Sequence, residues 1–464
     1  MLFNSEAFLF WFLPAALLGF FLCRRFVPAL AIPLLVIASL VFYAQWKLSY
    51  LFILLASVGF NYGAYLLLEK QSSRRTKHLL VALAVAANLG LLGFYKYSGF
   101  FVNDVLHLPI AGFEAPLLPL AISFFTFQQI AFIVDEAYTE TKRVRFDEYA
   151  AFVTFFPQLI AGPIVRHDEL IPQLKAPRPT GFFLAGTVMF LIGLSKKVLI
   201  ADTFARWASA GFASPSELTM SDAWLAALSY TMQLYFDFSG YSDMAIGLGL
   251  LFGFRLPQNF NSPYKAKSLQ DFWQRWHMTL SRWLRDYLYI PLGGNRRGKA
   301  RTYLNLFLTM LLGGLWHGAA WTFVVWGALH GAALALNRVW SRLGIGIWTP
   351  IAWMMTFVFI VFTWVFFRAE TIGDAVTVSA AMLGGQGFGF VQGGVVPLFV
   401  WGLLAAFVVI VRFAPNSHQI TDEVTERRGP LVWFALFLVG IVGTMAVKRM
   451  METSVPSEFL YFQF

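Results

Sequence analysis

Residues 309–327 read TMLLGGLWHGAAWTFVVWG, a run without a single Asp, Glu, Lys or Arg. A helix needs about 20 apolar residues to cross the hydrocarbon core of a bilayer, so the stretch predicts a membrane-embedded segment. Its one ionisable side chain is His317. An ionisable group in this setting is costly and indicates a functional site. The alternative is a histidine held in place by hydrogen bonds between helices.

The composition of the whole chain also indicates a membrane protein. Of its 464 residues, 58% are hydrophobic, 18% aromatic and 13% charged, whereas a soluble domain carries about 25% charged residues. The mean hydropathy is +0.63. Lipid must therefore cover much of the surface. The net charge of +10 indicates basic loops on one face of a membrane rather than nucleic-acid binding.

Apolar stretches recur along the chain and predict an all-α polytopic membrane protein with about nine to twelve transmembrane helices. The first is expected to be retained, because Arg24 and Arg25 follow it, whereas a signal peptide carries its positive charge before the apolar run. Basic residues after the first, third and fifth stretches predict a periplasmic N-terminus in a bacterial inner membrane. The stretches lie near residues 7–22, 28–45, 49–68, 79–95, 115–134, 181–200, 223–238, 302–315, 319–337, 350–367, 394–412 and 430–447.

Two segments mix charge with apolar residues and are not expected to cross the membrane as plain helices. In residues 135–180, Pro157, Gly162 and Pro163 interrupt any long helix. Residues 255–301 are rich in Trp, Arg and Tyr, which favours a helix at the interface or one that dips into the fold. Irregular backbone at membrane depth is tolerated only where protein or water surrounds it.

Three of the seven histidines lie within or beside apolar sequence, namely His277, His317 and His330. His317 is the first candidate for a general base, since a buried neutral imidazole can take a proton near neutral pH. Its glycine neighbours would let a ligand or another backbone approach closely. His277 is either a second catalytic histidine or part of an interfacial basic helix. On continuous helices, His277 would lie about two turns from Arg285 and His330 would lie far from His317, so His330 is secondary.

Carboxylates interrupt the apolar stretch QLYFDFSGYSDMAIG at residues 233–247. Asp237, Tyr241 and Asp243 are candidates to orient a histidine or a substrate hydroxyl. Buried carboxylates also need partners, so the alternative role of these residues is to staple helices together. The single cysteine, Cys23, is expected to be structural. The sequence has no P-loop, HExxH or paired-cysteine motif.

Four blocks of the sequence resemble the membrane-bound O-acyltransferase family. The opening MLFNSEAFLFWFLP and the closing FLYFQF are also similar to bacterial members, so the likeness covers essentially the whole chain. The blocks are FFPQLIAGPIVR (155–166), YFDFSGYSDMAIGLGLLFGF (235–254), WQRWHMTLSRWLRDYLYIPLGGNRRG (273–298) and LTMLLGGLWHGAAWTFVVWGALHG (308–331).

The resemblance implies many helices around a central tunnel, with N-terminal helices in residues 1–135, a catalytic core in 136–340 and C-terminal helices in 341–464. It also implies that His317 and His277 are catalytic. His317 would exchange a proton with the acceptor hydroxyl or the departing thiolate, and His277 would orient the reacting group. The residues expected to contact substrate or support the histidines are Trp316, Arg285, Asp286, Asp237, Tyr241 and Asp243.

The reaction and its partners are likewise implied by the resemblance. Acetyl groups would pass from a cytoplasmic thioester, acetyl-CoA or an acyl carrier protein, across the inner membrane. They would serve O-acetylation of an exported polysaccharide, alginate or cellulose. Periplasmic SGNH-type acetyltransferases would modify the polymer, and membrane lipid would surround the chain. No bound cofactor, metal or nucleic acid is expected.

Two other functions remain open from the residues alone. A transporter would spread buried charges over repeated halves with broken helices, and the sequence has no such symmetry. A scaffold that anchors an acetyltransferase complex would tolerate histidine substitutions but not changes in its loops.

Overall fold

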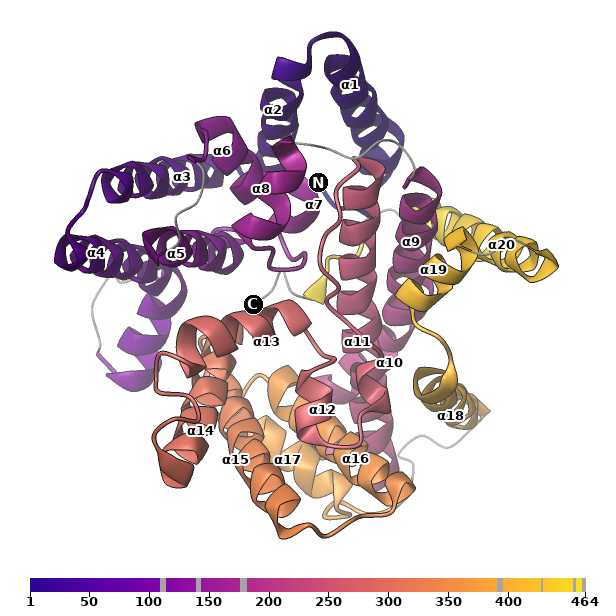
Figure 1. Cartoon of the computed structure of the whole chain (residues 1–464). Helices are drawn as coiled ribbons and strands as arrows, with labels where there is room; N and C mark the ends of the chain where they lie inside the picture. Colours follow the sequence, from indigo (N-terminus) through magenta and orange to yellow (C-terminus); the bar gives the residue numbers. More distant parts are fainter. Residues whose placement is uncertain are drawn as a thin grey trace. The chain divides into compact units, whose positions relative to one another are not determined.

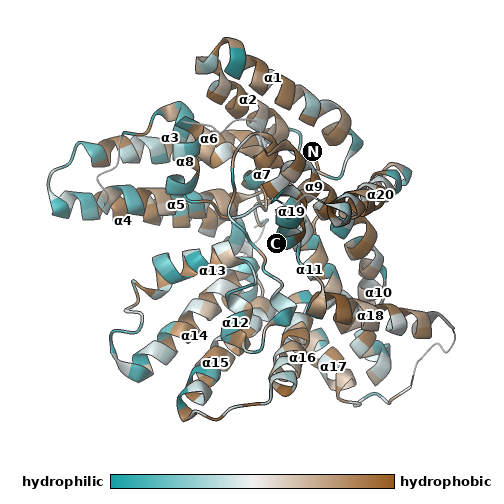
Figure 2. Ribbon diagram, turned by 45° about the vertical axis from the view of Figure 1, so that its right-hand side comes forward, coloured by the Kyte–Doolittle hydropathy of each residue, from teal (hydrophilic) through white to brown (hydrophobic). Residues whose placement is uncertain are grey.

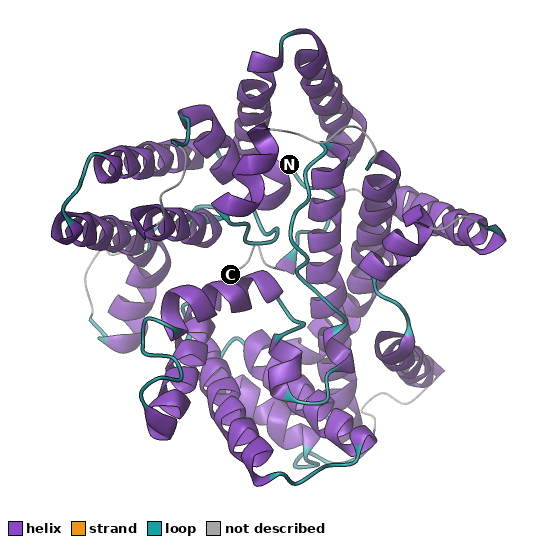
Figure 3. Cartoon of the chain, in the orientation of Figure 1, coloured by secondary structure: helices purple, strands orange, loops and turns teal. Residues whose placement is uncertain are grey.

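Long apolar runs form helices because a bilayer offers the backbone no water, so each N–H and C=O must bond within its own segment. The computed structural model describes residues 1–108, 114–138, 143–175, 182–389, 395–426, 429–453 and 456–460. Within these ranges the chain consists of helices and loops, without a strand (Figure 3). The predicted all-α class is confirmed. Residues 461–464, the end of the closing FLYFQF block, lie outside the described ranges.

The helices gather into two compact units. Unit 1 comprises Met1–Leu194, Tyr241–Pro257 and Val424–Gln463, and unit 2 comprises Ser195–Gly240 and Gln258–Glu423. Each unit therefore combines segments that are distant in sequence. The three consecutive segments expected from the sequence, with boundaries after residues 135 and 340, stay a prediction.

Most helices of unit 1 come from the first part of the chain (Figure 1). They are α1 (Leu13–Phe26), α2 (Ala31–Ala44), α3 (Leu48–Glu69), α4 (Arg74–Leu92), α5 (Ile122–Tyr138), α6 (Phe146–Thr154), α7 (Phe156–Leu159), α8 (His167–Lys175), α9 (Phe183–Ser195) and α20 (Pro430–Glu452). Shorter turns of 3₁₀ or π type are η1 (Ala7–Phe12), η2 (Pro28–Leu30), η3 (Gly93–Tyr97) and η4 (Phe100–Val105).

Unit 2 contains the remaining helices. They are α10 (Asp202–Ala213), α11 (Met220–Leu251), α12 (Leu269–Trp273), α13 (Met278–Leu284), α14 (Gly298–His317), α15 (Trp321–Leu343), α16 (Thr349–Arg368), α17 (Ile372–Met382), α18 (Val395–Phe413) and α19 (Ser417–Glu426). Its shorter turns are η5 (Lys196–Ala201), η6 (Pro215–Glu217), η7 (Pro263–Lys265) and η8 (Arg285–Tyr289). The helix α11 belongs to unit 2 up to Gly240 and to unit 1 from Tyr241 onward.

Six helical segments of the described chain are long and apolar enough to cross a membrane, or seven if the bent pair Leu398–Phe413 and Ser417–Glu426 counts as one span. The multi-pass prediction is confirmed, although the expected nine to twelve spans exceed this count. The difference lies in helices such as α15, where Trp, Gly and His lower the mean hydropathy. Figure 2 shows α1 and α18 hydrophobic along most of their length. The six segments are Ala7–Phe26, Leu48–Glu69, Arg74–Tyr97, Phe183–Ala213, Thr349–Arg368 and Val432–Glu452.

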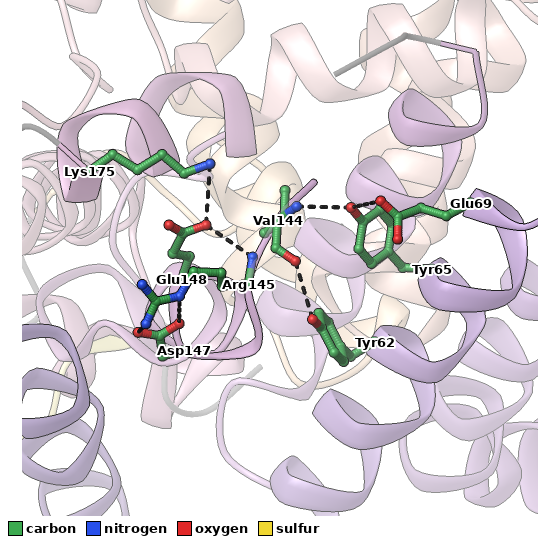
Figure 4. Close-up of polar contacts among 8 residues, drawn as sticks. All are labelled: Tyr62, Tyr65, Glu69, Val144, Arg145, Asp147, Glu148 and Lys175. Atoms are coloured by element: carbon green, nitrogen blue, oxygen red, sulfur yellow. Dashed lines mark hydrogen bonds and ion pairs between the residues drawn. The ribbon is translucent and has the colours of Figure 1, made fainter. Parts of the chain in front are cut away.

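In unit 1, polar contacts hold the segment before α6 against α3 (Figure 4). The backbone N–H of Val144 donates to the Tyr65 hydroxyl at 2.9 Å, and the Tyr62 hydroxyl donates to the Val144 carbonyl at 3.2 Å. Glu148 in α6 pairs with Lys175 at the end of α8, at 3.3 Å. Val144 is buried, so these bonds satisfy backbone groups that water cannot reach.

The segment with Pro157, Gly162 and Pro163 forms short helices, as predicted. Helix α6 ends at Thr154, and α7 is only four residues long. Residues 148–165 are all buried, so the surrounding protein shields the irregular backbone from lipid.

In unit 2, α14 and α15 form a hairpin and lie side by side (Figure 1). A Cβ on Gly314 would lie 2.9 Å from the Cα of Gly327, and a Cβ on Gly331 would lie 2.9 Å from the Cα of Phe307. Small residues of this kind let helices in a membrane pack backbone against backbone. The expectation that a glycine beside His317 admits another backbone is confirmed for Gly314.

Residues 255–301 do not form one continuous amphipathic helix. They fold into η7, α12, α13 and η8, and the chain breaks at His277, whose φ is +42°. The helical chain toward Arg285 begins only at Met278, and the separation of His277 from Arg285 stays a prediction. In this segment Trp273, Trp276 and Trp283 are buried rather than laid on a membrane surface.

Candidate active site

His317 is the last residue of α14. The helix ends there because Gly318 is extended, with φ −159° and ψ 148°, before α15 begins at Trp321. The imidazole is only 3% exposed. Its ring centre lies 5.2 Å from that of Trp326, edge to face, and 5.2 Å from that of Phe367. His317 thus lies within the aromatic core of unit 2, not against lipid.

His277 caps the start of α13 and is fully buried. Its Nδ1 lies 3.1 Å from the Oδ1 of Asn259. The same Oδ1 accepts from the hydroxyl of Thr279 at 2.9 Å and from its backbone N–H at 3.4 Å, so this atom is the amide oxygen. Because an oxygen of this kind only accepts, Nδ1 of His277 carries the proton and Nε2 carries the lone pair.

Burial lowers the pKa of His277 to about 3, because an imidazolium loses its hydration in the protein interior. The ring is therefore neutral at physiological pH. A neutral imidazole with a fixed Nδ1–H and a basic Nε2 can accept a hydrogen bond or a proton from a hydroxyl group.

The two predicted catalytic histidines share one aromatic neighbour, Trp316. The Trp316 ring centre lies 6.2 Å from that of His277 and 5.0 Å from that of His317. His277 also meets the edge of Phe238, on α11, at 4.7 Å. The structure thus brings together three of the predicted site residues, from α13 and α14, in a dry aromatic setting where electrostatic interactions are strong.

His330 has a different role. The indole N–H of Trp273 donates to its Nδ1 at 3.2 Å, and its Nε2 lies 3.0 Å from the hydroxyl of Thr363. The indole of Trp can only donate, so the proton of neutral His330 lies on Nε2, which donates a hydrogen bond to the Thr363 hydroxyl. That hydroxyl in turn donates to the Ile360 carbonyl. Both nitrogens serve contacts between helices.

The expected separation of His330 from His317 was based on one continuous helix and is wrong. Because α14 and α15 form a hairpin, the Trp326 ring contacts both histidines, at 5.2 Å for His317 and 4.7 Å for His330.

Asp237 lies in a buried ion-pair cluster. Its Oδ1 lies 2.7 Å from the Nζ of Lys197, which also lies 2.9 Å from Asp202. Asp237 is 2% exposed. These contacts join η5 and α10 to α11, which agrees with the stapling alternative. Sequence reasoning missed Lys197, although a lysine inside an apolar stretch calls for a carboxylate partner.

Arg285 and Asp286 pair with each other at 2.6 Å. The Arg285 side chain is 62% exposed and lines a cavity between α13, α14 and α15. The structure therefore places Arg285 at this cavity.

Tyr241 and Asp243 belong to unit 1, where both are buried. The Tyr241 ring stacks on Phe3 at 4.9 Å and meets the edge of Phe459 at 4.5 Å. Phe3 and Phe459, near the two ends of the chain, thus pack against the same tyrosine. The role of Tyr241 and Asp243 in catalysis stays a prediction.

Asn259 is the most important residue that sequence reasoning missed. It fixes the tautomer of His277 from 18 positions away. An asparagine in a polar loop carries no signal in one sequence that would link it to a histidine.

Comparisons with known proteins identify the family of this chain. The model of the membrane-bound O-acyltransferase family matches residues 137–372. The peptidoglycan O-acetyltransferase of Helicobacter pylori is 45% identical, over 83% of this chain and 80% of that protein. The probable alginate O-acetylase AlgI of Pseudomonas aeruginosa is 44% identical, over 93% of this chain and 84% of that protein. The teichoic acid D-alanyltransferase of Bacillus subtilis is 28% identical, over 54% of this chain and 69% of its own length.

The family match spans both His277 and His317, and the first two of these relatives align along most of both chains. Together with the membrane-spanning helices, this similarity settles the class of protein. The chain belongs to the membrane-bound O-acyltransferase family and is a multi-pass membrane acyltransferase.

Proposed function

We propose that this enzyme moves acetyl groups from a cytoplasmic thioester across the inner membrane, for O-acetylation of an exported saccharide polymer. The observation that carries the proposal is the pair of buried histidines, His277 and His317, in contact with the same Trp316. Acyl transfer from a thioester to an alcohol needs a group that removes the alcohol proton and returns it to the thiolate, and imidazole suits both steps.

In the proposed reaction, Nε2 of His277, whose Nδ1–H is held by Asn259, orients the acceptor by accepting a hydrogen bond from a second hydroxyl of the acceptor. The acceptor oxygen attacks the thioester carbonyl carbon while its proton moves to the imidazole of His317. The carbon–sulfur bond then breaks, and the thiolate takes the same proton from His317. The step leaves an ester and a free thiol, with both histidines restored.

The donor is acetyl-CoA or an acetylated carrier protein, and no resident cofactor takes part. We place the N-terminus in the periplasm, because the basic residues of the early loops favour the cytoplasmic side. The acetyl group would then be handed to periplasmic acetyltransferase partners of SGNH type that modify the polymer.

The acceptor polymer is one of a few candidates. The relatives include proteins named for alginate and for peptidoglycan acetylation, whereas the expectation of cellulose rests on the sequence resemblance alone. Ester-linked acetate should be measured in each polymer from cells with and without this protein. Acetate that disappears from one polymer identifies the acceptor.

The decisive test is His317→Ala expressed in such cells. We expect polymer acetylation to fall to background while the variant accumulates in the membrane at the normal level. His78→Ala, on α4 of unit 1 and outside the site, is the matched control. Undiminished acetylation with His317→Ala would refute the proposal.

A second assay separates chemistry from transport or scaffolding. The purified enzyme in detergent should release free thiol from acetyl-CoA or an acetylated carrier protein in the presence of an alcohol acceptor. A transporter or scaffold would leave the thioester intact with either donor.

A further inference from the structure

A cavity of about 200 Å³ lies in unit 2 between α12, α13, α14 and α15. Much of its wall is apolar, with Leu284, Leu306 and Leu334 among the lining residues. Arg285 and Arg338 also line it. Arg338 lies one turn beyond Leu334 on α15 and interacts with Tyr289, one turn after Arg285, so the basic side chains gather at one end.

Two tryptophans near the ends of α15 indicate the level of this cavity in a membrane. Trp321 and Trp340 are 47% and 42% exposed. They are separated by 19 positions, or about 28 Å along a helix, which is close to the thickness of the hydrocarbon core. Exposed tryptophans prefer the two interfaces of a bilayer. A membrane crossing by α15 would place Arg338 at headgroup level and Leu334 one turn deeper.

The segment that lines most of the cavity is strongly basic. From Met278 to Leu343 it carries eight Lys and Arg residues and a single acidic residue, Asp286. All eight precede Thr302 or follow Asn337, so the length of the hairpin between them is uncharged. Asp286 pairs with Arg285. Positive charge at the mouth of an apolar cavity between helices suits an anionic lipid headgroup.

The outer surface of the hairpin is apolar. Leu312 and Leu336 are 44% and 69% exposed, which is expected where a helix faces lipid tails. A phospholipid whose phosphate meets Arg338 can therefore place an acyl chain along Leu334 and Leu306 without crossing a polar surface.

We propose that this cavity is a binding site for one anionic phospholipid. Its phosphate lies against Arg338 and Arg285, and one acyl chain lies in the cavity between α13 and the α14–α15 hairpin. The cavity wall is also connected to the candidate active site. Trp273 lines the cavity and donates to His330, and His330 contacts Trp326, which contacts His317. An occupied cavity would thus hold the aromatic surroundings of His317 in place.

The test measures lipid retention and does not depend on acetyl transfer. The full-length protein is delipidated in detergent, mixed with equal amounts of phosphatidylglycerol and phosphatidylcholine, and analysed by native mass spectrometry. We expect one phosphatidylglycerol to be retained. Arg338→Gln should weaken its retention about tenfold, as expected for the loss of a charged hydrogen bond. Arg342→Gln is the matched control, because Arg342 is exposed on the same helix and binds Tyr303 at 2.7 Å.

A second pair of variants tests the acyl-chain part of the site. Leu334→Trp fills the cavity and should abolish retention, whereas Leu336→Trp, on the exposed face of the same helix, should not. These variants distinguish a seated lipid from lipid that coats the surface.

Four results would overturn the proposal. Equal retention of both lipids, or equal losses with Arg338→Gln and Arg342→Gln, would show that no specific headgroup site exists. Displacement of phosphatidylglycerol by inorganic phosphate would indicate a site for free phosphate. Displacement by coenzyme A, lost with Arg338→Gln, would assign the cavity to the soluble thioester donor.

Discussion

His277 and His330 are both fully buried histidines in unit 2, yet their surroundings differ in kind. His330 lies within α15, and its two nitrogens are used by Trp273 of α12 and Thr363 of α16. His277 lies in a left-handed break between α12 and α13, and its Nδ1 is held by Asn259. One histidine has the proton on Nε2, and the other has it on Nδ1.

The difference shows how a structural histidine can be told from a reactive one. Burial alone does not separate them. The tautomer does, because the partner at Nδ1 decides which nitrogen keeps the lone pair. At His330 that partner is a donor and the lone pair is consumed, whereas at His277 it is an acceptor and the basic nitrogen is Nε2. The backbone of His277 supports this reading, since strained conformations of this kind concentrate at functional sites.

Of the two histidines in this comparison, His277 carries the larger expected effect. His277→Asn keeps a residue that tolerates the left-handed backbone but removes Nε2, which orients the acceptor. We expect the turnover number to fall about 10²-fold, the cost of a misplaced reacting group, with little change in the thermal midpoint. The measurement is thiol release from the thioester by the purified variant.

His277→Gly provides the control for this prediction, since glycine also accepts a positive φ. If both variants kept turnover within about threefold of wild type, a range well below the effect of a misplaced reacting group, His277 would be a structural residue like His330 and the contrast would disappear.

The second effect concerns the pH dependence. Asn259→Asp puts a carboxylate beside Nδ1 of His277 and should raise the pKa of this histidine from its burial-lowered value of about 3 by about 1–3 units. His277 accepts a hydrogen bond at Nε2 only when neutral. Activity of the variant should therefore fall as the pH drops through about 4–6, whereas the wild type keeps its activity over this range.

A pH profile of the thiol-release rate checks whether the variant loses activity at low pH. An acid limb at the same pH in both proteins would mean that Asn259 does not control the ionisation of His277. Asn261→Asp is the matched control, because Asn261 lies two positions away and bonds Asn416 rather than a histidine.

The contrast also shows which features of this protein are predictable from its sequence. The uncharged run around His317 predicts a membrane-embedded segment with a costly ionisable side chain, because both signals are local in the sequence. The end of α14 at His317 depends on the extended Gly318, and the break at His277 depends on a left-handed residue that is not a glycine. The hydropathy pattern separates the stretches 302–315 and 319–337, but it shows neither the extended backbone of Gly318 nor the break at His277. The partners that assign the roles, Asn259 for His277 and Trp273 for His330, are set by tertiary packing.

A smaller effect is expected at His330. His330→Phe keeps the ring volume but leaves the buried indole N–H of Trp273 without an acceptor. The free energy of unfolding should decrease by about 1–3 kcal/mol, the cost of an unsatisfied buried donor, and turnover of the folded variant should stay within about threefold, far less than the loss of an acid–base group would cause. Thermal unfolding in detergent and thiol release measure the two quantities. A turnover loss as large as that of His277→Asn, without a change in stability, would show that His330 takes part in the chemistry.

The smallest effect on turnover is expected at Thr363, which accepts from Nε2 of His330 and donates to the Ile360 carbonyl. Thr363→Val preserves the shape but leaves the buried Nε2–H of His330 without an acceptor, and should cost about 1–3 kcal/mol. Thr363→Ser keeps the hydroxyl and should restore most of this loss. Because His330 would still accept from Trp273, its tautomer and its contact with Trp326 should persist, and turnover should be unchanged. If Thr363→Val instead lowered turnover with an unaltered unfolding midpoint, the Trp273–His330–Thr363 chain would be a proton route. The distinction between the two histidines by tautomer would then fail.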